Sequence, residues 1–109
     1  MIDWTRVTAL REEVGDEDFA MIVDIFRDEV DEVIARLRAA PDAGRIEEDL
    51  HFLKGSALNL GFAALGNLCH EGEALAGGGR LDAFDLGRLF TVYEQSWADF
   101  RARCPVGER

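Results

Sequence analysis

The chain has 109 residues, of which 48% are hydrophobic, and its 22 acidic and 12 basic residues give a formal net charge of −10 at pH 7. This length suffices for one domain with a modest core but not for an additional nucleotide-binding domain, so any chemistry that needs ATP is expected to come from a partner. The negative charge argues against binding to nucleic acid or to an anionic membrane surface, and no unbroken apolar stretch approaches the length of a membrane span.

Apolar residues recur along the chain at three- and four-residue steps, which is the spacing of one helix face, and no alternating strand pattern of useful length occurs. A short helix is expected over residues 3–14, with Gly15 closing it. A longer helix is expected to begin at an N-cap near Asp16 and to stop at Pro41. The inward faces of these two helices are expected to contain Trp4, Val7, Leu10 and Val14, followed by Phe19, Ile22, Val23, Phe26, Val30, Val33 and Leu37.

Three more helices are expected in the rest of the chain, beginning between Asp42 and Ile46, near Ala63 and near Asp82, and ending at Gly61, at Ala76 and before Pro105. The run Gly77-Gly78-Gly79 marks the break before the last of them. Large aromatic residues on the last helix should dominate its docking onto the others. The inward faces are expected to contain Ile46, Leu50, Leu53, Ala57 and Leu60, then Leu65, Leu68, Cys69, Gly72, Leu75 and Ala76, and finally Leu86, Leu89, Phe90, Tyr93, Trp97 and Phe100.

Four amphipathic helices joined by short loops predict an all-α fold, an antiparallel four-helix bundle with a short additional N-terminal helix. The domain is expected to extend over residues 1–104 and to be monomeric, with residues 105–109 as a short polar C-terminal tail. Cys69 and Cys104 lie in apolar helical patterns, where buried free thiols are common, so no disulfide is expected between them. The N-terminal residues show no basic region followed by an apolar segment, so the expected location is the cytoplasm.

The residues that point to a chemical function lie in the middle of the third expected helix, at His51, Lys54 and Gly55. Glycine inside a helix costs about 1 kcal/mol relative to alanine, so its presence indicates a packing or functional reason. At roughly 100° per residue, His51 points about 140° away from the centre of the inward stripe, and its imidazole should therefore face solvent. Lys54 and Gly55 follow by three and four residues and share that face.

An exposed imidazole with a cation and an empty space beside it suits a phosphoryl carrier. Neutral imidazole is a good nucleophile near pH 7. Attack on a phosphoryl group requires in-line approach and compensation of the charge on its equatorial oxygens. Gly55 would admit a partner's active site, and Lys54 would offset the negative charge.

Two neighbours of His51 are predicted to contribute to partner binding. Glu47, four residues earlier, could accept a hydrogen bond from the imidazole and orient it, although a solvated glutamate on the helix face is the simpler interpretation. Leu58 falls near the azimuth of His51 two turns later, and an exposed apolar side chain beside a reactive histidine suggests a docking patch. A single surface leucine is also common, so both interpretations of Leu58 remain open.

The run His51-x-Leu53-Lys54-Gly55-Ser56-x-x-x-Leu60-Gly61, followed by Leu65, Leu68, Cys69 and Glu73, resembles the signature of histidine phosphotransfer (HPt) domains of multistep phosphorelays. The opening Ile2-Asp3-Trp4 and the helix from Phe19 to Val33 also look like the family's usual start, so the resemblance covers nearly the whole chain.

The resemblance implies that His51 is the phosphorylated residue, that Lys54 lies beside the phosphoryl group and that Gly55 gives access. It also implies a carrier that is not an enzyme and has no kinase activity or cofactor of its own. Such a carrier exchanges phosphate with aspartates of response-regulator receiver domains, including those of hybrid sensor kinases, and the partner receiver domain supplies Mg²⁺. Ser56 matches the family too, but its azimuth points away from His51, so we expect it to pack or to hydrogen-bond helix carbonyls.

Three other functions fit the same residues less well. A sensor-kinase dimerisation domain usually has an acidic residue after the histidine and a proline soon afterwards, whereas Phe52 follows here and the next proline is Pro105. A metal site would need His51, Cys69, His70 and Cys104, which lack metal-ligand spacing. An unphosphorylated helical-bundle adaptor that binds a receiver domain or another signalling partner would not need the histidine, lysine and glycine together.

Overall fold

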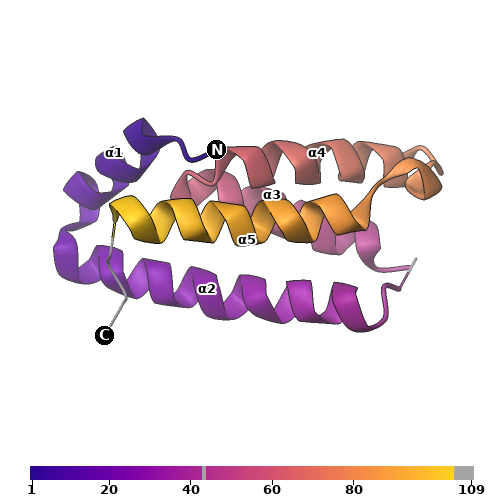
Figure 1. Cartoon of the computed structure of the whole chain (residues 1–109), viewed down its shortest axis with the longest axis horizontal. Coiled ribbons are helices and arrows are strands. Elements are labelled where there is room, and N and C mark those ends of the chain that lie inside the picture. Colours follow the sequence, from indigo (N-terminus) through magenta and orange to yellow (C-terminus); the bar gives the residue numbers. More distant parts are fainter. Residues whose placement is uncertain (43, 105–109) are drawn as a thin grey trace.

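The computed structural model describes residues 1–42 and 44–104, which form helices running antiparallel around one core (Figure 1). The described residues include no strand. The helices are α1 (Trp4–Val14), α2 (Asp16–Ala39), α3 (Ile46–Leu60), α4 (Ala63–Gly77), the short 3-10 helix η1 (Leu81–Ala83) and α5 (Leu86–Arg103). The predicted all-α bundle with a short first helix is confirmed. The tail predicted at 105–109 lies outside the described residues.

Two helix starts differ from the expected ones. The residue before α2 is Gly15, with φ 88°, so Asp16 is the first helical residue and not the N-cap. Acidic residues occupy the first turn of α2, where their negative charge interacts favourably with the positive end of the helix dipole. α5 begins later than the predicted start near Asp82, because residues 81–83 form their own turn and Asp85 caps the helix by accepting from the Arg88 backbone N–H at 3.1 Å.

The tight turn between α3 and α4 brings these two helices into close contact. Gly61 ends α3 as predicted, in the left-handed conformation with φ 101°, which favours glycine. Its carbonyl accepts from the Asp3 N–H at 2.7 Å, so the N-terminal segment is tied to the turn. Further along, a Cβ placed on Gly66 would lie 2.5 Å from Leu58 Cδ2. The absence of a side chain at Gly66 therefore permits the close approach of α4 to α3.

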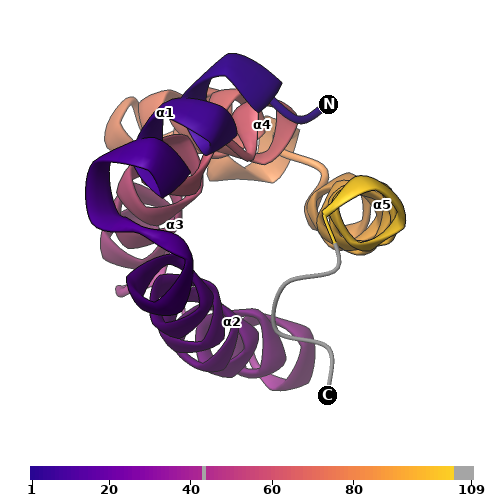
Figure 2. The ribbon, with the colours of Figure 1, turned by 90° about the vertical axis from the view of Figure 1, so that its left-hand side faces the viewer.

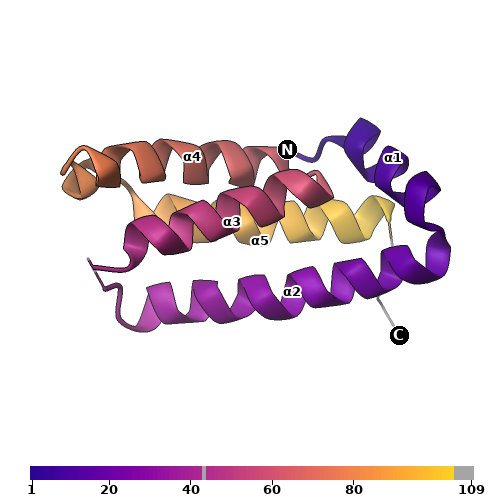
Figure 3. The ribbon, with the colours of Figure 1, turned by 180° about the vertical axis from the view of Figure 1, so that it is seen from behind.

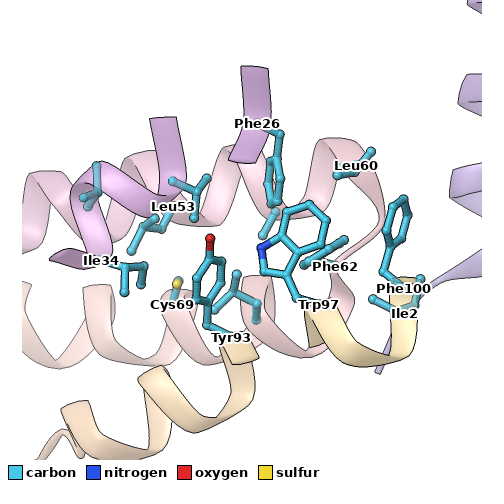
Figure 4. Close-up of a cluster of buried hydrophobic side chains, with 14 of the residues drawn as sticks. Ile2, Phe26, Ile34, Leu53, Leu60, Phe62, Cys69, Tyr93, Trp97 and Phe100 are labelled. Carbon is cyan, nitrogen blue, oxygen red and sulfur yellow. The ribbon is translucent and has the colours of Figure 1, made fainter. Parts of the chain in front are cut away.

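Aromatic side chains fill the centre of the bundle (Figure 4). Phe62 is fully buried, and its ring centroid lies 4.9 Å from that of Phe26 and 5.1 Å from that of Trp97. Trp97 in turn contacts Phe100 edge to face at 5.6 Å. Periodicity did not assign Phe62 to the core, because it stands in the turn between two helices. This cluster joins α2, the turn between α3 and α4, and α5 around one interior.

Viewed end-on, α3 lies between α2 and α4, and α5 stands on the opposite side of the core (Figure 2). Of the outer surface of α3, the C-terminal end is contacted by α1, where Arg6 Nε donates to the Asn59 carbonyl at 2.8 Å. At the surface, an ion pair joins α2 to α5, because Arg38 Nη2 lies 2.5 Å from Glu94 Oε2. No helix in the described ranges is long and apolar enough to cross a membrane.

Candidate functional site

His51 lies in the middle of α3, on the face turned away from the core. Its side chain is 69% exposed, whereas Leu50 and Leu53 on either side of it are fully buried. Burial of these leucines fixes the rotation of α3 about its own axis and so turns the imidazole towards solvent. The predicted exposure of His51 is confirmed.

A carboxylate from the neighbouring helix holds one nitrogen of the imidazole. Glu73, on α4, places Oε2 at 2.7 Å from His51 Nδ1. Because an ionised carboxylate only accepts hydrogen bonds, Nδ1 is the nitrogen that carries the hydrogen and donates it. In neutral imidazole this leaves the lone pair on Nε2, which is the nucleophilic nitrogen.

The same carboxylate also pairs with the lysine of the motif. Lys54 Nζ lies 2.7 Å from Glu73 Oε1, so the two oxygens of Glu73 bridge Lys54 and His51. The hydrogen bond from Lys54 is the main reason why the pKa of Glu73 is lowered, and the hydrogen bond from His51 acts in the same direction, while partial burial opposes both. Glu73 is thus an anionic bridge between the imidazole and the ammonium group. Lys54 is the only lysine of the chain.

Gly55 leaves open space one turn beyond His51. A Cβ built on Gly55 would meet no atom within 4 Å, in contrast to Gly66, where it would clash. Close packing between helices therefore does not explain the glycine at position 55. A side chain at position 55 would stand on the exposed face that His51 shares, and the access role of Gly55 stays a prediction.

Glu47 and Leu58 lie on the same side of α3 as His51 but contact other parts of α4. The carboxylate at His51 Nδ1 comes from Glu73 and not from Glu47, whose Oε2 lies beside Gly77, 3.1 Å from the position of an added Cβ. Leu58 is 45% exposed and covers Gly66. The partner-binding roles of Glu47 and Leu58 stay predictions.

Glu73 is the residue of this site whose role was missed in the sequence, although it was part of the matching motif. Its partner His51 belongs to another helix, and periodicity says nothing about the register between two helices. A signal was nevertheless present. The tight turn at Gly61 makes α3 and α4 antiparallel, and His51 and Glu73 are equally far from Phe62 in the sequence, so the two side chains lie opposite each other.

The residues weighed as metal ligands do not gather into one site. Cys69 is buried in the core, where burial raises the pKa of its thiol to about 12, whereas His51 and His70 are exposed. Cys69 and Cys104 are both free thiols, as expected. Within residues 1–42 and 44–104, no group of three or more His, Cys, Asp or Glu side chains could hold a metal ion.

A model of the Hpt domain family matches residues 21–99 of the chain. No curated protein and no solved structure matches the chain. The matched range begins within α2, ends within α5 and includes His51, Lys54, Gly55 and Glu73. Hpt domains take part in histidine phosphotransfer in phosphorelays and interact with response-regulator receiver domains and kinases. Because the match spans most of the chain and includes the whole His51 site, the chain belongs to the Hpt domain family.

Proposed function

We propose that this chain is a phosphocarrier that accepts a phosphoryl group on His51 Nε2 from a phosphorylated aspartate of one receiver domain and donates it to an aspartate of another. The observation that supports this role is the exposure and orientation of the His51 imidazole. Its side chain is 69% exposed, Nδ1 is held by Glu73 at 2.7 Å, and the position beside it at Gly55 is open.

In the proposed step, the lone pair of Nε2 attacks the phosphorus atom in line with the bond to the aspartate oxygen. The N–P bond forms while the P–O bond breaks, and the aspartate leaves as a carboxylate. The hydrogen stays on Nδ1, so the ring becomes positively charged as the bond forms. Glu73 accepts the Nδ1 hydrogen bond and stabilises that charge where it develops. The reverse step returns the phosphoryl group to an aspartate.

Lys54 and Gly55 serve this transfer in different ways. The ammonium of Lys54 is held by Glu73 near the imidazole and is available to phosphoryl oxygens once they arrive. Gly55 lets the partner's surface approach His51 closely. We propose that the chain has no cofactor of its own and that the receiver domain supplies the Mg²⁺ that compensates the charge of the phosphoryl oxygens.

Radioactive transfer tests this function directly. A receiver domain phosphorylated with ³²P should label the chain with an acid-labile, base-stable phosphoramidate, and His51→Gln should remove the label. His70→Gln is the matched control, since His70 is the only other histidine and is also exposed, on α4. Label that persists in His51→Gln, or that never appears with any receiver domain of the source organism, would contradict the proposal.

The alternative is an adaptor that binds a receiver domain without being phosphorylated. Such a protein has no use for the open space at Gly55 or for the hydrogen bond that aims Nε2 outward. The same experiment separates the two functions. An adaptor would bind receiver domains with equal affinity before and after His51→Gln and would never take up label.

A further inference from the structure

The two long sides of α3 differ in how they meet the neighbouring helices. On the α4 side, the close approach at Gly66 leaves little room between the helices. On the α2 side, cavities of about 290, 310 and 140 Å³ follow one another along the seam and share lining residues. Figure 3 shows this side of the bundle, with α2 and α3 both facing the viewer. We call this row of cavities the α2–α3 groove.

The middle cavity of the α2–α3 groove lies beside the phosphorylation site. Phe52 forms part of its wall, directly follows His51 in α3 and is 39% exposed. Further along the same helix pair, Ile25 lines the smallest cavity and is 53% exposed. A protein that reaches Nε2 of His51 therefore covers exposed apolar surface in this groove. The middle cavity is lined by Glu29, Glu32, Val33 and Arg36 of α2 and by Glu48, Asp49 and Phe52 of α3.

The walls of the middle cavity carry an excess of negative charge. Four carboxylates line it together with a single guanidinium, that of Arg36. This cation is already paired, because Arg36 Nη2 lies 2.8 Å from Asp49 Oδ1 and Nη1 lies 3.8 Å from Glu32 Oε1. No ion pair joins Glu29 or Glu48 to a cation in the part of the chain that the structure describes. The groove thus combines apolar surface at Phe52 with uncompensated carboxylates.

A receiver domain brings an aspartate carboxylate to His51, because that is the group that exchanges phosphate with the imidazole. The uncompensated carboxylates of the groove attract cations and repel further negative charge, and complementary charges at the rim of an interface mainly speed association and exclude wrong partners. We propose that the α2–α3 groove selects receiver domains that present an apolar side chain flanked by Arg or Lys, with the apolar group on Phe52 and the cations on Glu29 and Glu48. This inference rests on the proposed phosphocarrier function.

The test compares two doubly neutralised variants of the phosphorylated chain. Glu29→Gln/Glu48→Gln removes the free carboxylates of the groove. Glu12→Gln/Glu13→Gln makes the same charge change on exposed residues of α1. Each protein is phosphorylated on His51 with the small reagent phosphoramidate, and transfer to a receiver domain that accepts phosphate from the wild type is followed at low protein concentration in 50 and 500 mM NaCl.

At 50 mM NaCl, the groove variant should transfer phosphate about threefold to tenfold more slowly than the wild type, as expected for two partly exposed ion pairs across an interface. Salt should slow the wild type and the α1 variant, and all three rates should converge at 500 mM, where charges are screened beyond a few ångströms. Phosphoramidate should label all three proteins equally, since it needs no docking.

Equal rates for the groove variant and the wild type at 50 mM NaCl would overturn the selection by charge while leaving the phosphocarrier function intact. A wild-type transfer rate that does not change between 50 and 500 mM NaCl would also overturn the selection by charge. Labelling of His51 by phosphoramidate without transfer to any receiver domain would refute the phosphocarrier function, and this inference with it. Phe52→Ser provides a second check, because it should slow transfer at both salt concentrations.

Discussion

Replacing Gly55 by alanine is expected to stabilise the bundle and to slow phosphotransfer at the same time. The added methyl group meets no atom within 4 Å, so it causes no clash. Alanine loses less backbone entropy than glycine on entering a helix, and the free energy of unfolding should therefore rise by about 0.5–1 kcal/mol. For a domain of this size, the melting temperature should increase by about 2–8 °C, which thermal unfolding followed by circular dichroism can measure.

The effect on function should grow with the size of the side chain at position 55. A side chain at position 55 would stand one turn from His51 on the exposed face, where it would hold the partner's aspartate away from Nε2. Displacement of reacting groups by about 1 Å can cost on the order of 100-fold in rate, so Gly55→Leu should transfer phosphate at least about tenfold more slowly, with Gly55→Ala between it and the wild type. Labelling of His51 by phosphoramidate should be nearly unchanged, because this reagent is small.

Gly66→Ala is the matched control, since it makes the same substitution at the glycine where helices touch. Its Cβ would lie 2.5 Å from Leu58 Cδ2 and 2.7 Å from Cγ, so Leu58 must move. Because Leu58 is 45% exposed and can shift, Gly66→Ala should be less stable than Gly55→Ala by about 1 kcal/mol, the low end of the cost of overpacking. A Gly55→Ala protein with a lower melting temperature than the wild type would refute the argument that the space beside Gly55 is open. A Gly55→Leu protein that transfers phosphate at the wild-type rate would refute the access argument.

Further predictions concern the polar groups of the site and the core. Glu73→Gln should lower stability at neutral pH, and because the pKa of Glu73 is lowered in the folded chain, the difference from the wild type should shrink as the pH falls below about 4, as measured by urea unfolding at several pH values. Lys54→Met should shorten the lifetime of phosphohistidine without changing the melting curve by more than a few degrees, and an unchanged lifetime would exclude contact between Lys54 and the phosphoryl group. In a Cys104→Ser background, Cys69 should resist alkylation at pH 8 in the folded protein and react only in denaturant, because it is fully buried and its thiol pKa is raised to about 12.

Helix periodicity was sufficient to predict the type and order of the long helices, because each buries one continuous apolar stripe. It also predicted the outward direction of His51, since the buried leucines on either side of it leave only one orientation for the helix. The less accurate boundaries were those governed by short local structures. The turn at residues 81–83 delays the start of α5, and the N-cap of α2 is Gly15 and not Asp16. Such turns lack a repeating pattern.

Contacts between helices were harder to predict than the helices themselves. For the carboxylate beside His51, the sequence offered only Glu47, within the same helix, and favoured a solvated side chain for it; the hydrogen bond at His51 Nδ1 comes from Glu73 on another helix. Burial of Phe62 was missed for a related reason, since its neighbours Phe26 and Trp97 come from distant parts of the chain. In both cases the deciding quantity is the register of one helix against another, which depends on packing in three dimensions.

The bridge formed by Glu73 determines which part of the molecule could be transplanted. A motif of His51, Lys54 and Gly55 copied onto the helix of another protein would carry the imidazole without the carboxylate that bonds its Nδ1 and holds the lysine. The carboxylate and the imidazole come from the two helices between Ile46 and Gly77, and the turn at Gly61 sets their register. For protein engineering, the reactive centre is thus a property of a helix pair, and insertion of one residue in that turn should disable it while leaving every residue of the motif in place.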